Sequence, residues 1–274
     1  MRCAHGPEFP RRGFVGVLGV GLAAVLAGCA WTREPLQVGP VQVRPPQAEE
    51  PPQPPPPVAE PGGRVAELRA GPAGTQQIAL TVDDGYCDSC VAGYVAFARR
   101  TGTHLTFSPN GAYADAWVPH AVVLRPLIEA GQVQIMNHTF NHLDLTRLPA
   151  AQVREELDSN ELWITKTFAT TTRPYYRPPF GAHDSRVDNA AAVVGFDRLV
   201  MWNGSFGDAK LLTPEILMAE ARRYLHPGVI MLGHANHGTI LGLFDQILQL
   251  IDDRQIEPVT LDEMFGTHRP AHPR

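Results

Sequence analysis

The stretch Ile78-Ala79-Leu80-Thr81-Val82-Asp83-Asp84-Gly85 decides the fold of this chain. Its apolar run, residues 78–83, ends at two carboxylates and a glycine, which is typical of a buried strand that stops at a turn. Comparable apolar runs follow at residues 104–109, 133–137, 175–177, 198–202, 229–233 and 258–261. Segments with helical spacing separate them, at residues 91–100, 118–130, 151–168, 185–194, 214–225 and 241–254.

Short strands that alternate with helices predict parallel strands joined by helical crossovers. Seven strands in about 195 residues predict an α/β fold, namely a distorted and incomplete (β/α) barrel rather than one with eight units. An open, doubly wound sheet is the alternative. In both architectures, functional side chains gather where the strands end and the following loops begin.

The composition indicates a globular protein without affinity for polyanions. Of the 274 residues, 44% are hydrophobic and 19% are charged, which excludes a wholly disordered chain. The formal net charge of −5 offers no positive field for a nucleic-acid backbone or an anionic membrane surface. We expect no nucleic-acid partner, and we expect the protein to be a monomer.

The N-terminal residues predict an export signal. Arg11 and Arg12 precede the uncharged residues 13–28, which are too few to span a bilayer of about 30 Å comfortably. A positive flank before such a segment is typical of a secretory signal peptide, here residues 1–28. The ending Leu26-Ala27-Gly28-Cys29 resembles the bacterial lipobox, which implies that Cys29 carries lipid and anchors the protein to the cell membrane, outside the cytoplasm. The arginine pair also resembles a twin-arginine signal, and a plain N-terminal anchor is the alternative.

A proline-rich segment follows the signal and predicts a tether. Residues 31–62 contain eleven prolines, so this segment cannot bury a core and is expected to sample polyproline II. We expect a disordered tether at residues 29–72, a folded domain at residues 73–266 and a short tail at residues 267–274.

The four cysteines have different expected fates. Cys3 leaves with the signal peptide and Cys29 takes the lipid, so Cys87 and Cys90 remain. Outside the cytoplasm this Cys-x-x-Cys pair predicts a local disulfide. A zinc clip and a thioredoxin-like redox pair are the alternatives, although the clip lacks a second pair of cysteine ligands.

Polar side chains follow the predicted strands at one end of the fold. Asp83 and Asp84 end the first strand, and because adjacent side chains point in different directions, one can hold a metal ion while the other serves as a base. His138 and His142 follow the third strand, and a helical turn there would direct both imidazoles at one ion. Two histidines and one carboxylate leave coordination positions open, as a catalytic metal requires. An Asp-Asp-Gly turn without chemistry is the alternative for the two aspartates.

Two further strands end in groups that suit catalysis. The fourth runs into Arg177-Pro178-Pro179-Phe180-Gly181, where an arginine beside a stiff turn suits a fixed carboxylate partner. The sixth runs into His234, and a single histidine after an apolar strand is more often structural than catalytic. Its arrival at the same end of the fold as the other three features favours a functional role. His237 either contacts substrate or caps the strand.

The motifs Thr-x-Asp-Asp-Gly, His-Thr-x-x-His, Arg-Pro-Pro-Phe-Gly and Leu-x-His, in this order from Thr81, resemble those of the NodB-type polysaccharide deacetylases, carbohydrate esterase family 4. The resemblance covers residues 76–266. Each motif alone is weak evidence, whereas four in order are specific. The resemblance implies a distorted (β/α) barrel of fewer than eight units, in agreement with the number of predicted strands.

The resemblance also implies a role for each matching residue. The implied metal ligands are Asp84, His138 and His142. Asp83 would be the general base, with Arg177 holding and tuning it, and His234 would be the general acid. The backbone N–H of Phe180 would donate to the oxyanion, and Leu232 would form a wall of the pocket for the acetyl methyl.

One segment departs from the family's pattern. The family carries Asp-x-x-Asp-Trp after the fifth strand, whereas this chain has only the second acid, Asp208, and Ala209 replaces the tryptophan. We expect Asp208 to pair with Arg177. We also expect Trp202 or Phe206 to fill the space beside the acetyl methyl; otherwise the acyl pocket is wider.

A second departure follows the first motif. The family often continues Asp-Asp-Gly with proline, where this chain has Tyr86. A disulfide between Cys87 and Cys90 would stiffen this ligand loop, and a simple surface staple is the alternative.

Together the residues and the resemblance predict an envelope-tethered, metal-dependent hydrolase that removes acetyl groups from an N-acetylated glycan. Zinc is the expected metal, and iron, cobalt or nickel also suit this ligand set. One alternative is an O-acetyl esterase or a hydrolase of another acyl amide. Another is a glycan-binding lipoprotein without catalysis, against which the complete set of metal, base and acid residues argues.

Overall fold

The computed structural model describes residues 65–266, to which the statements below refer. The strands are β1 (Ala66–Leu68), β2 (Gln77–Asp84), β3 (Leu105–Pro109), β4 (Val133–Ile135), β5 (Tyr175–Tyr176), β6 (Arg198–Val200), β7 (Gly204–Ser205), β8 (Ile230–His234) and β9 (Glu257–Val259). The helices are α1 (Asp88–Thr101), α2 (Ala114–Trp117), α3 (Ala121–Glu129), α4 (Ala150–Phe168), α5 (Ser185–Val193), α6 (Pro214–Tyr224), α7 (Phe244–Asp253) and α8 (Leu261–Phe265). The predicted signal peptide, Cys29 and the tail at 267–274 lie outside the described residues.

The strands form two sheets that are joined at one end. One sheet has the order β4-β3-β2-β8-β7, with β9 beside β2, and the other has the order β1-β6-β5. All pairs between these strands are parallel. A parallel bridge between Asn137 and Tyr176 connects the end of β4 to β5, and residues 201–203 lead from β6 into β7 of the other sheet. The predicted α/β fold, a distorted and incomplete barrel of parallel strands, is confirmed.

Alternation along the strands separates the inside of the barrel from the layer under the helices. In β2, Ile78, Leu80 and Val82 pack in the cluster that contains side chains of α1, α3, α6 and α7. Ala79 belongs to a separate interior cluster with residues of β5, β6, β8 and β9. Since side chains alternate along a strand, Asp83 shares the inward side with Ala79.

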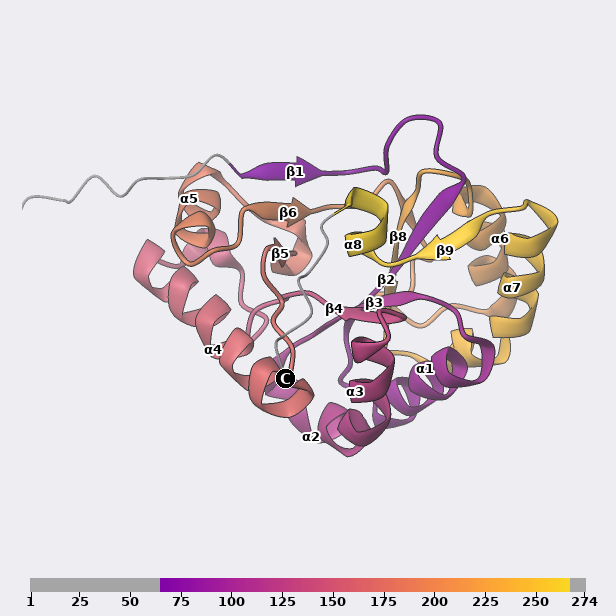
Figure 1. Cartoon of the computed structure of the whole chain (residues 1–274), viewed down its shortest axis with the longest axis horizontal. Helices are drawn as coiled ribbons and strands as arrows, with labels where there is room; N and C mark the ends of the chain where they lie inside the picture. Colours follow the sequence, from indigo (N-terminus) through magenta and orange to yellow (C-terminus); the bar gives the residue numbers. More distant parts are fainter. Residues whose placement is uncertain (1–64, 267–274) are drawn as a thin grey trace, which may run out of the picture. The chain divides into compact units, whose positions relative to one another are not determined.

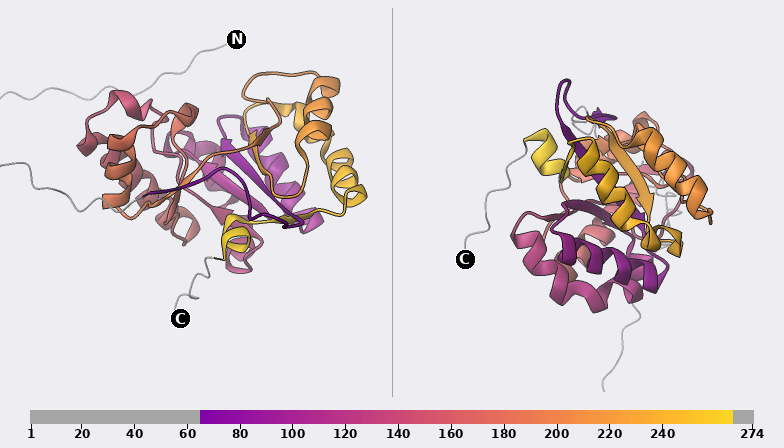
Figure 2. Two further views of the ribbon diagram at one scale, coloured as in Figure 1. Left: turned by 90° about the horizontal axis from the view of Figure 1, so that it is seen from above. Right: turned by 90° about the vertical axis from the view of Figure 1, so that its right-hand side faces the viewer.

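The helices cover the outside of both sheets. Helices α1, α3, α6 and α7 pack on the sheet that contains β2, and α4 and α5 pack on β5 and β6 (Figures 1 and 2). In the part of the chain that the structure describes, no helix combines the length and the apolar character needed to cross a membrane.

Several predicted boundaries differ from the structure, and two of them have a clear physical reason. The tether predicted at 29–72 extends too far, because Ala66–Leu68 forms β1 and pairs with β6, so the folded domain includes residues before 73. The strand predicted at 258–261 ends at Val259, because Thr260 caps the following helix α8. In this capping box the Thr260 hydroxyl accepts from the Glu263 N–H, and the Glu263 carboxylate accepts from the Thr260 N–H.

Candidate active site

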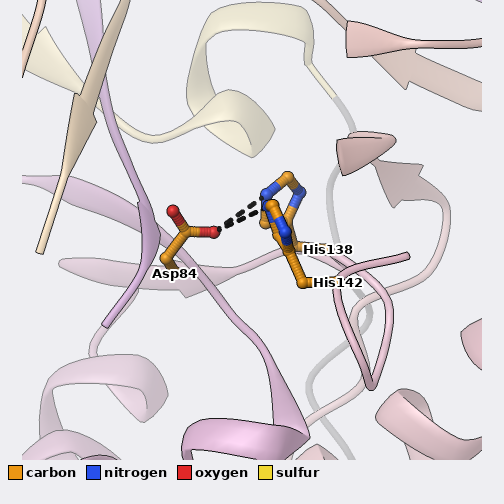
Figure 3. A group of neighbouring side chains, drawn as sticks. All are labelled: Asp84, His138 and His142. Carbon is orange, nitrogen blue, oxygen red and sulfur yellow. Dashed lines mark ion pairs between the residues drawn. The ribbon is translucent and has the colours of Figure 1, made fainter. Parts of the chain in front are cut away.

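Asp84, His138 and His142 converge on one point at the C-terminal end of the strands (Figure 3). The Oδ1 atom of Asp84 lies 3.2 Å from Nε2 of His138 and 3.2 Å from Nε2 of His142. This oxygen is buried and has no hydrogen-bond partner among the described residues. A buried carboxylate oxygen without a donor is rare in folded proteins, and it requires a compensating group.

The tautomer of His138 identifies the compensating group. Its Nδ1 lies 2.7 Å from the carbonyl oxygen of Arg177, so Nδ1 carries the proton that it donates. The Nε2 lone pair of the neutral ring then faces Asp84 Oδ1. Lone pairs that converge in this way fit a divalent cation, and a carbonyl acceptor behind a histidine ligand is the usual support of such a site.

The electrostatics of these three residues suit a cation. The nearby imidazoles of His138 and His142 and the hydrogen bond from Asn236 outweigh burial and lower the pKa of Asp84 well below its usual range. Burial lowers the pKa of His142, so its ring is held neutral. Burial also disfavours a proton on His138, but the charges of Asp83 and Asp84 overcome it and raise the pKa. A cation would take the place of that proton.

The two histidines do not lie on a helical turn, and that prediction is wrong. Residues 138–142 form an irregular loop after β4, in which Thr139 and His142 have φ angles of 68° and 54°. Such angles are unusual for residues other than glycine and persist where the surroundings impose them. The imidazoles meet because of the loop's fold rather than because of helical spacing.

Four buried side chains, the loop clamp Asn110, Asn137, Glu156 and Asn160, hold the backbone of this loop. Asn110 donates to the carbonyl oxygens of residues 138 and 139, and the Asn137 amide oxygen accepts from the N–H of residue 139 at 2.9 Å. The Glu156 carboxylate accepts from the N–H groups of residues 140 and 141. Asn160 donates to Asn137 and accepts from the N–H of residue 111. The clamp satisfies polar backbone that would otherwise be buried without partners.

Asp83 and Arg177 form a buried ion pair beside the three ligands. An Nη1 N–H of Arg177 donates to Asp83 Oδ1 at 2.8 Å, and the hydroxyl of Ser108 donates to the same oxygen. Arg177 is fully buried, and its other N–H groups donate to Thr81 Oγ1 and to the carbonyl oxygens of residues 200 and 201. The second carboxylate oxygen, Oδ2, lies 3.8 Å from His138 Nε2. Asp83 therefore has one anchored oxygen and one that faces the ligands.

Asp208 pairs with His234, so its predicted pairing with Arg177 is wrong. Nδ1 of His234 donates to Asp208 Oδ1 at 2.9 Å, and the His234 backbone N–H donates to Oδ2. The physical reason is strand pairing: Asp208 follows β7, which pairs with β8, the strand that ends at His234. Arg177 already has acceptors for its N–H groups.

His234 carries a proton readily and lies next to Asp83. Burial works against its charge, but the hydrogen bond to Asp208 and the charges of Asp83 and Asp208 outweigh burial and raise the pKa of His234. With Nδ1 committed to Asp208, Nε2 remains for a substrate. Asp83 and His234 are partners in the register of β2 and β8, so the two side chains end neighbouring strands.

These groups open into a cleft of about 470 Å³, within the range of about 300–1,000 Å³ usual for ligand sites. The substrate-contacting residues of the prediction, Phe180, Leu232 and Trp202, all line it. Phe180 has a φ of 61° and is 70% exposed. The centroid of its ring lies 4.8 Å from the centroid of the His142 ring. Phe206 belongs to the core under the helices instead. The small residues Ser205, Gly207 and Ala209 also line the cleft.

Sequence reasoning missed the residues that hold Asp84. The side-chain amide of Asn236 donates to Asp84 Oδ2 at 2.7 Å and accepts from the Gly85 N–H. The indole N–H of Trp117 donates to the Asp84 carbonyl oxygen at 2.9 Å. A Cβ at Gly85 would lie 2.2 Å from this indole, so the position needs glycine. The available signal for Asn236 was its place two residues after His234, at the end of β8.

Cys87 and Cys90 form a disulfide at the N-terminus of α1, directly after the Asp84 loop. The Cys87 backbone carbonyl accepts from the Cys90 N–H at 2.9 Å, so the bridge encloses the first turn of the helix. Both backbone and side chain therefore fix the chain at this point.

The fold and the site together define a class of protein. Two imidazoles and a carboxylate that face one point, with a second carboxylate and imidazole beside them, are typical of α/β hydrolases that use a divalent cation. The family model described as polysaccharide deacetylase matches residues 70–199. Over these residues the chain is similar to polysaccharide deacetylases.

Relatives are similar to this chain in sequence, and solved structures share its fold. The peptidoglycan-N-acetylmuramic acid deacetylase PdaA of Bacillus subtilis is 27% identical over 160 residues, which are 57% of this chain and 59% of PdaA. The structure of a peptidoglycan N-acetylglucosamine deacetylase superposes with a TM-score of 0.65 at 22% identity, covering 74% of this chain and 94% of that one. A family 4 pseudoenzyme from Bacillus anthracis has a TM-score of 0.64 at 18% identity, covering 73% and 68%.

Proposed function

We propose that this protein hydrolyses acetyl groups from an N-acetylated glycan, such as a cell-wall polysaccharide. The observation that carries the proposal is the convergence of Asp84, His138 and His142 beside Asp83 and His234 in one cleft. Hydrolysis of an acetamide needs a group that polarises the carbonyl, a general base and a general acid. The first three of these residues could hold a cation for the first role, and Asp83 and His234 could serve as base and acid.

Asp84, His138 and His142 would hold a divalent cation, with zinc as the first candidate. The fit rests on the buried, unpartnered Asp84 Oδ1 and the two Nε2 atoms that face it. When bound, such a cation supplies Lewis acidity, which polarises a carbonyl group and makes water more acidic.

Asp83 would take the proton from the attacking water. Arg177 and Ser108 fix its Oδ1, so Oδ2 is the oxygen available to accept that proton. The buried guanidinium also compensates the carboxylate charge, which would otherwise be costly to keep in the barrel interior.

His234 would give a proton to the leaving nitrogen, since an amine leaves far more readily than an amide anion. The raised pKa of His234 favours the charged ring that can donate this proton. The Phe180 N–H would stabilise the oxyanion, and Leu232 would contact the acetyl methyl.

Hydrolysis of an amide with a larger acyl group is the second candidate, and one observation favours it. Ser205, Gly207 and Ala209 line the cleft with little side-chain volume. A pocket with this wall has room for more than a methyl group. Acetyl, propionyl and butyryl substrates of one sugar distinguish the two candidates.

We also propose that the protein acts outside the cytoplasm, attached to the bacterial membrane through lipid on Cys29. The support is the sequence of residues 11–29. The variant Cys29→Ser should move the protein from the membrane fraction to the soluble fraction, and unchanged membrane association would contradict the anchor.

Acetate release from metal-loaded protein tests the function, with N-acetylglucosamine oligomers, peptidoglycan and acetylated xylan as substrates. We expect Asp83→Asn to lower kcat by about 10²- to 10⁴-fold, the usual contribution of a general base. Its metal content should match that of the wild type. Asp252→Asn, an exposed change on α7, is the control. A protein that binds these glycans but releases no acetate would be a binding lipoprotein instead.

A further inference from the structure

We propose that Tyr86, Tyr113 and His237, named here the aromatic rim, bind the sugar ring next to the one that is deacetylated. This inference rests on the proposed function and adds a second binding site for neutral carbohydrate. Tyr86 and Tyr113 both line the catalytic cleft. None of the three rim residues belongs to the metal, base or acid groups.

The rim is a connected cluster of rings. The Tyr86 hydroxyl lies 3.3 Å from His237 Nε2, and the two rings meet edge to face, with centroids 6.1 Å apart. Tyr86 and Tyr113 also meet edge to face, at 5.8 Å. The Tyr86 side chain is nevertheless 49% exposed. A large ring that neighbours hold and solvent still reaches is typical of a ligand contact.

Strand order puts the rim on one side of the site. Tyr86 follows β2, Tyr113 follows β3 and His237 follows β8, and β2 lies between the other two strands. Phe180 follows β5, which belongs to the other sheet. In the order of strands around the barrel, β4 and β3 lie between β5 and β2. The rim therefore lies on the opposite side of the barrel from Phe180, and the loop of His138, which follows β4, lies between them. A glycan that extends from the metal site on the β2 side meets the rim first.

The chemistry of the cleft fits a neutral sugar. Aromatic rings contact the C–H faces of a pyranose, and the tyrosine hydroxyls and the imidazole can hydrogen-bond its hydroxyl groups. Arg177 is the single cationic side chain among the described lining residues besides the histidines, and it is fully buried and paired with Asp83. The lining thus offers no exposed arginine or lysine for a phosphate or carboxylate group.

The backbone on both sides of Tyr86 is fixed. On one side the Gly85 N–H donates to Asn236, and on the other side Cys87 is tied to Cys90. An exposed ring on a fixed backbone loses little conformational entropy on binding, so the rim is preorganised. This gives the disulfide a role in substrate binding as well as in the structure of α1.

Binding of N-acetylglucosamine oligomers of one and four units tests the inference by calorimetry. Zinc-loaded protein with Asp83→Asn, which prevents turnover, is the background. We expect Tyr86→Ala to weaken tetramer binding about tenfold, and Tyr86→Phe, which keeps the ring, about threefold. Monomer binding should change less than about twofold, because the monomer occupies the site next to the metal. Leu162→Ala, a similarly exposed apolar change on α4, is the control.

The outcomes separate the rim from the proposed function. Equal effects of Tyr86→Ala on monomer and tetramer, or no effect on the tetramer, would overturn the rim. Tetramer binding that depends on Tyr86 in a wild-type protein that releases no acetate would support the rim and refute deacetylation. Breaking the disulfide with Cys87→Ser and Cys90→Ser should weaken tetramer binding alone, and an unchanged tetramer affinity would remove the disulfide from the proposal.

Discussion

The ligand loop and the aromatic rim are two parts of one cleft with opposite physical character. The loop of His138 is buried, and its backbone is held by the loop clamp, Asn110, Asn137, Glu156 and Asn160. The rim is open to solvent, and Tyr86 has a single hydrogen-bonded side-chain neighbour, His237, among the described residues. Buried polar groups need partners whereas exposed rings do not. Changes to the clamp should therefore affect stability and metal binding, and changes to the rim should affect substrate alone.

Among these variants, Asn160→Ala in the loop clamp is expected to have the largest effect. Asn160 is fully buried, and its loss leaves the Gly111 N–H and the Pro109 carbonyl without their partner. We expect the free energy of unfolding to fall by about 3 kcal/mol and the affinity for zinc to weaken, as measured by denaturant unfolding and zinc titration. The exposed Asn189→Ala on α5 should change stability by less than about 0.5 kcal/mol. Equal effects of the two variants would show that the clamp stabilises neither the fold nor the metal site.

An intermediate effect is expected from Asp208→Asn, which removes the carboxylate partner of His234. Because this carboxylate helps to raise the pKa of His234, its loss lowers that pKa. The acid form is then lost at a lower pH. The alkaline limb of the kcat profile should move to lower pH, with a fall in kcat of about tenfold at neutral pH. An alkaline limb that stays in place would exclude His234 as the group that titrates there.

The smallest effect on stability is expected at the rim. Tyr86→Ala removes an exposed ring, so the free energy of unfolding should change by less than about 1 kcal/mol and zinc affinity should not change. Denaturant unfolding and zinc titration check this. A loss as large as that of Asn160→Ala would mean that the rim supports the fold, and the contrast between the two regions would disappear.

Periodicity and motif order were sufficient to predict the barrel and the position of the chemistry. Asp83 and His234 end apolar runs and His138 follows one, and parallel strands place their C-terminal ends together. Arg177 follows the two-residue strand β5, and its motif rather than periodicity indicated its position. The short strand β7 has two residues, which is too few for any periodic signal. Without β7 the position of Asp208 could not be predicted, and its pairing was assigned to the wrong partner.

The support of the site was harder to predict than the site itself. Asn110, Asn160 and Asn236 act through hydrogen bonds to residues 28 to 152 positions away. No local pattern marks an asparagine for such a contact, because the contact depends on how α4 and β8 pack. The spacing of His138 and His142 also suggests a helical turn wrongly, because a spacing of four fits a helical turn and an irregular loop alike.

Metal stoichiometry tests the central claim most directly. Purified wild-type protein, loaded with zinc and freed of excess, should hold one equivalent by mass spectrometry of the metal. His138→Ala should hold less than a tenth of that, while His226→Ala, at an exposed position, should match the wild type. Retention of a full equivalent by His138→Ala would contradict the convergence of Asp84, His138 and His142 on one ion.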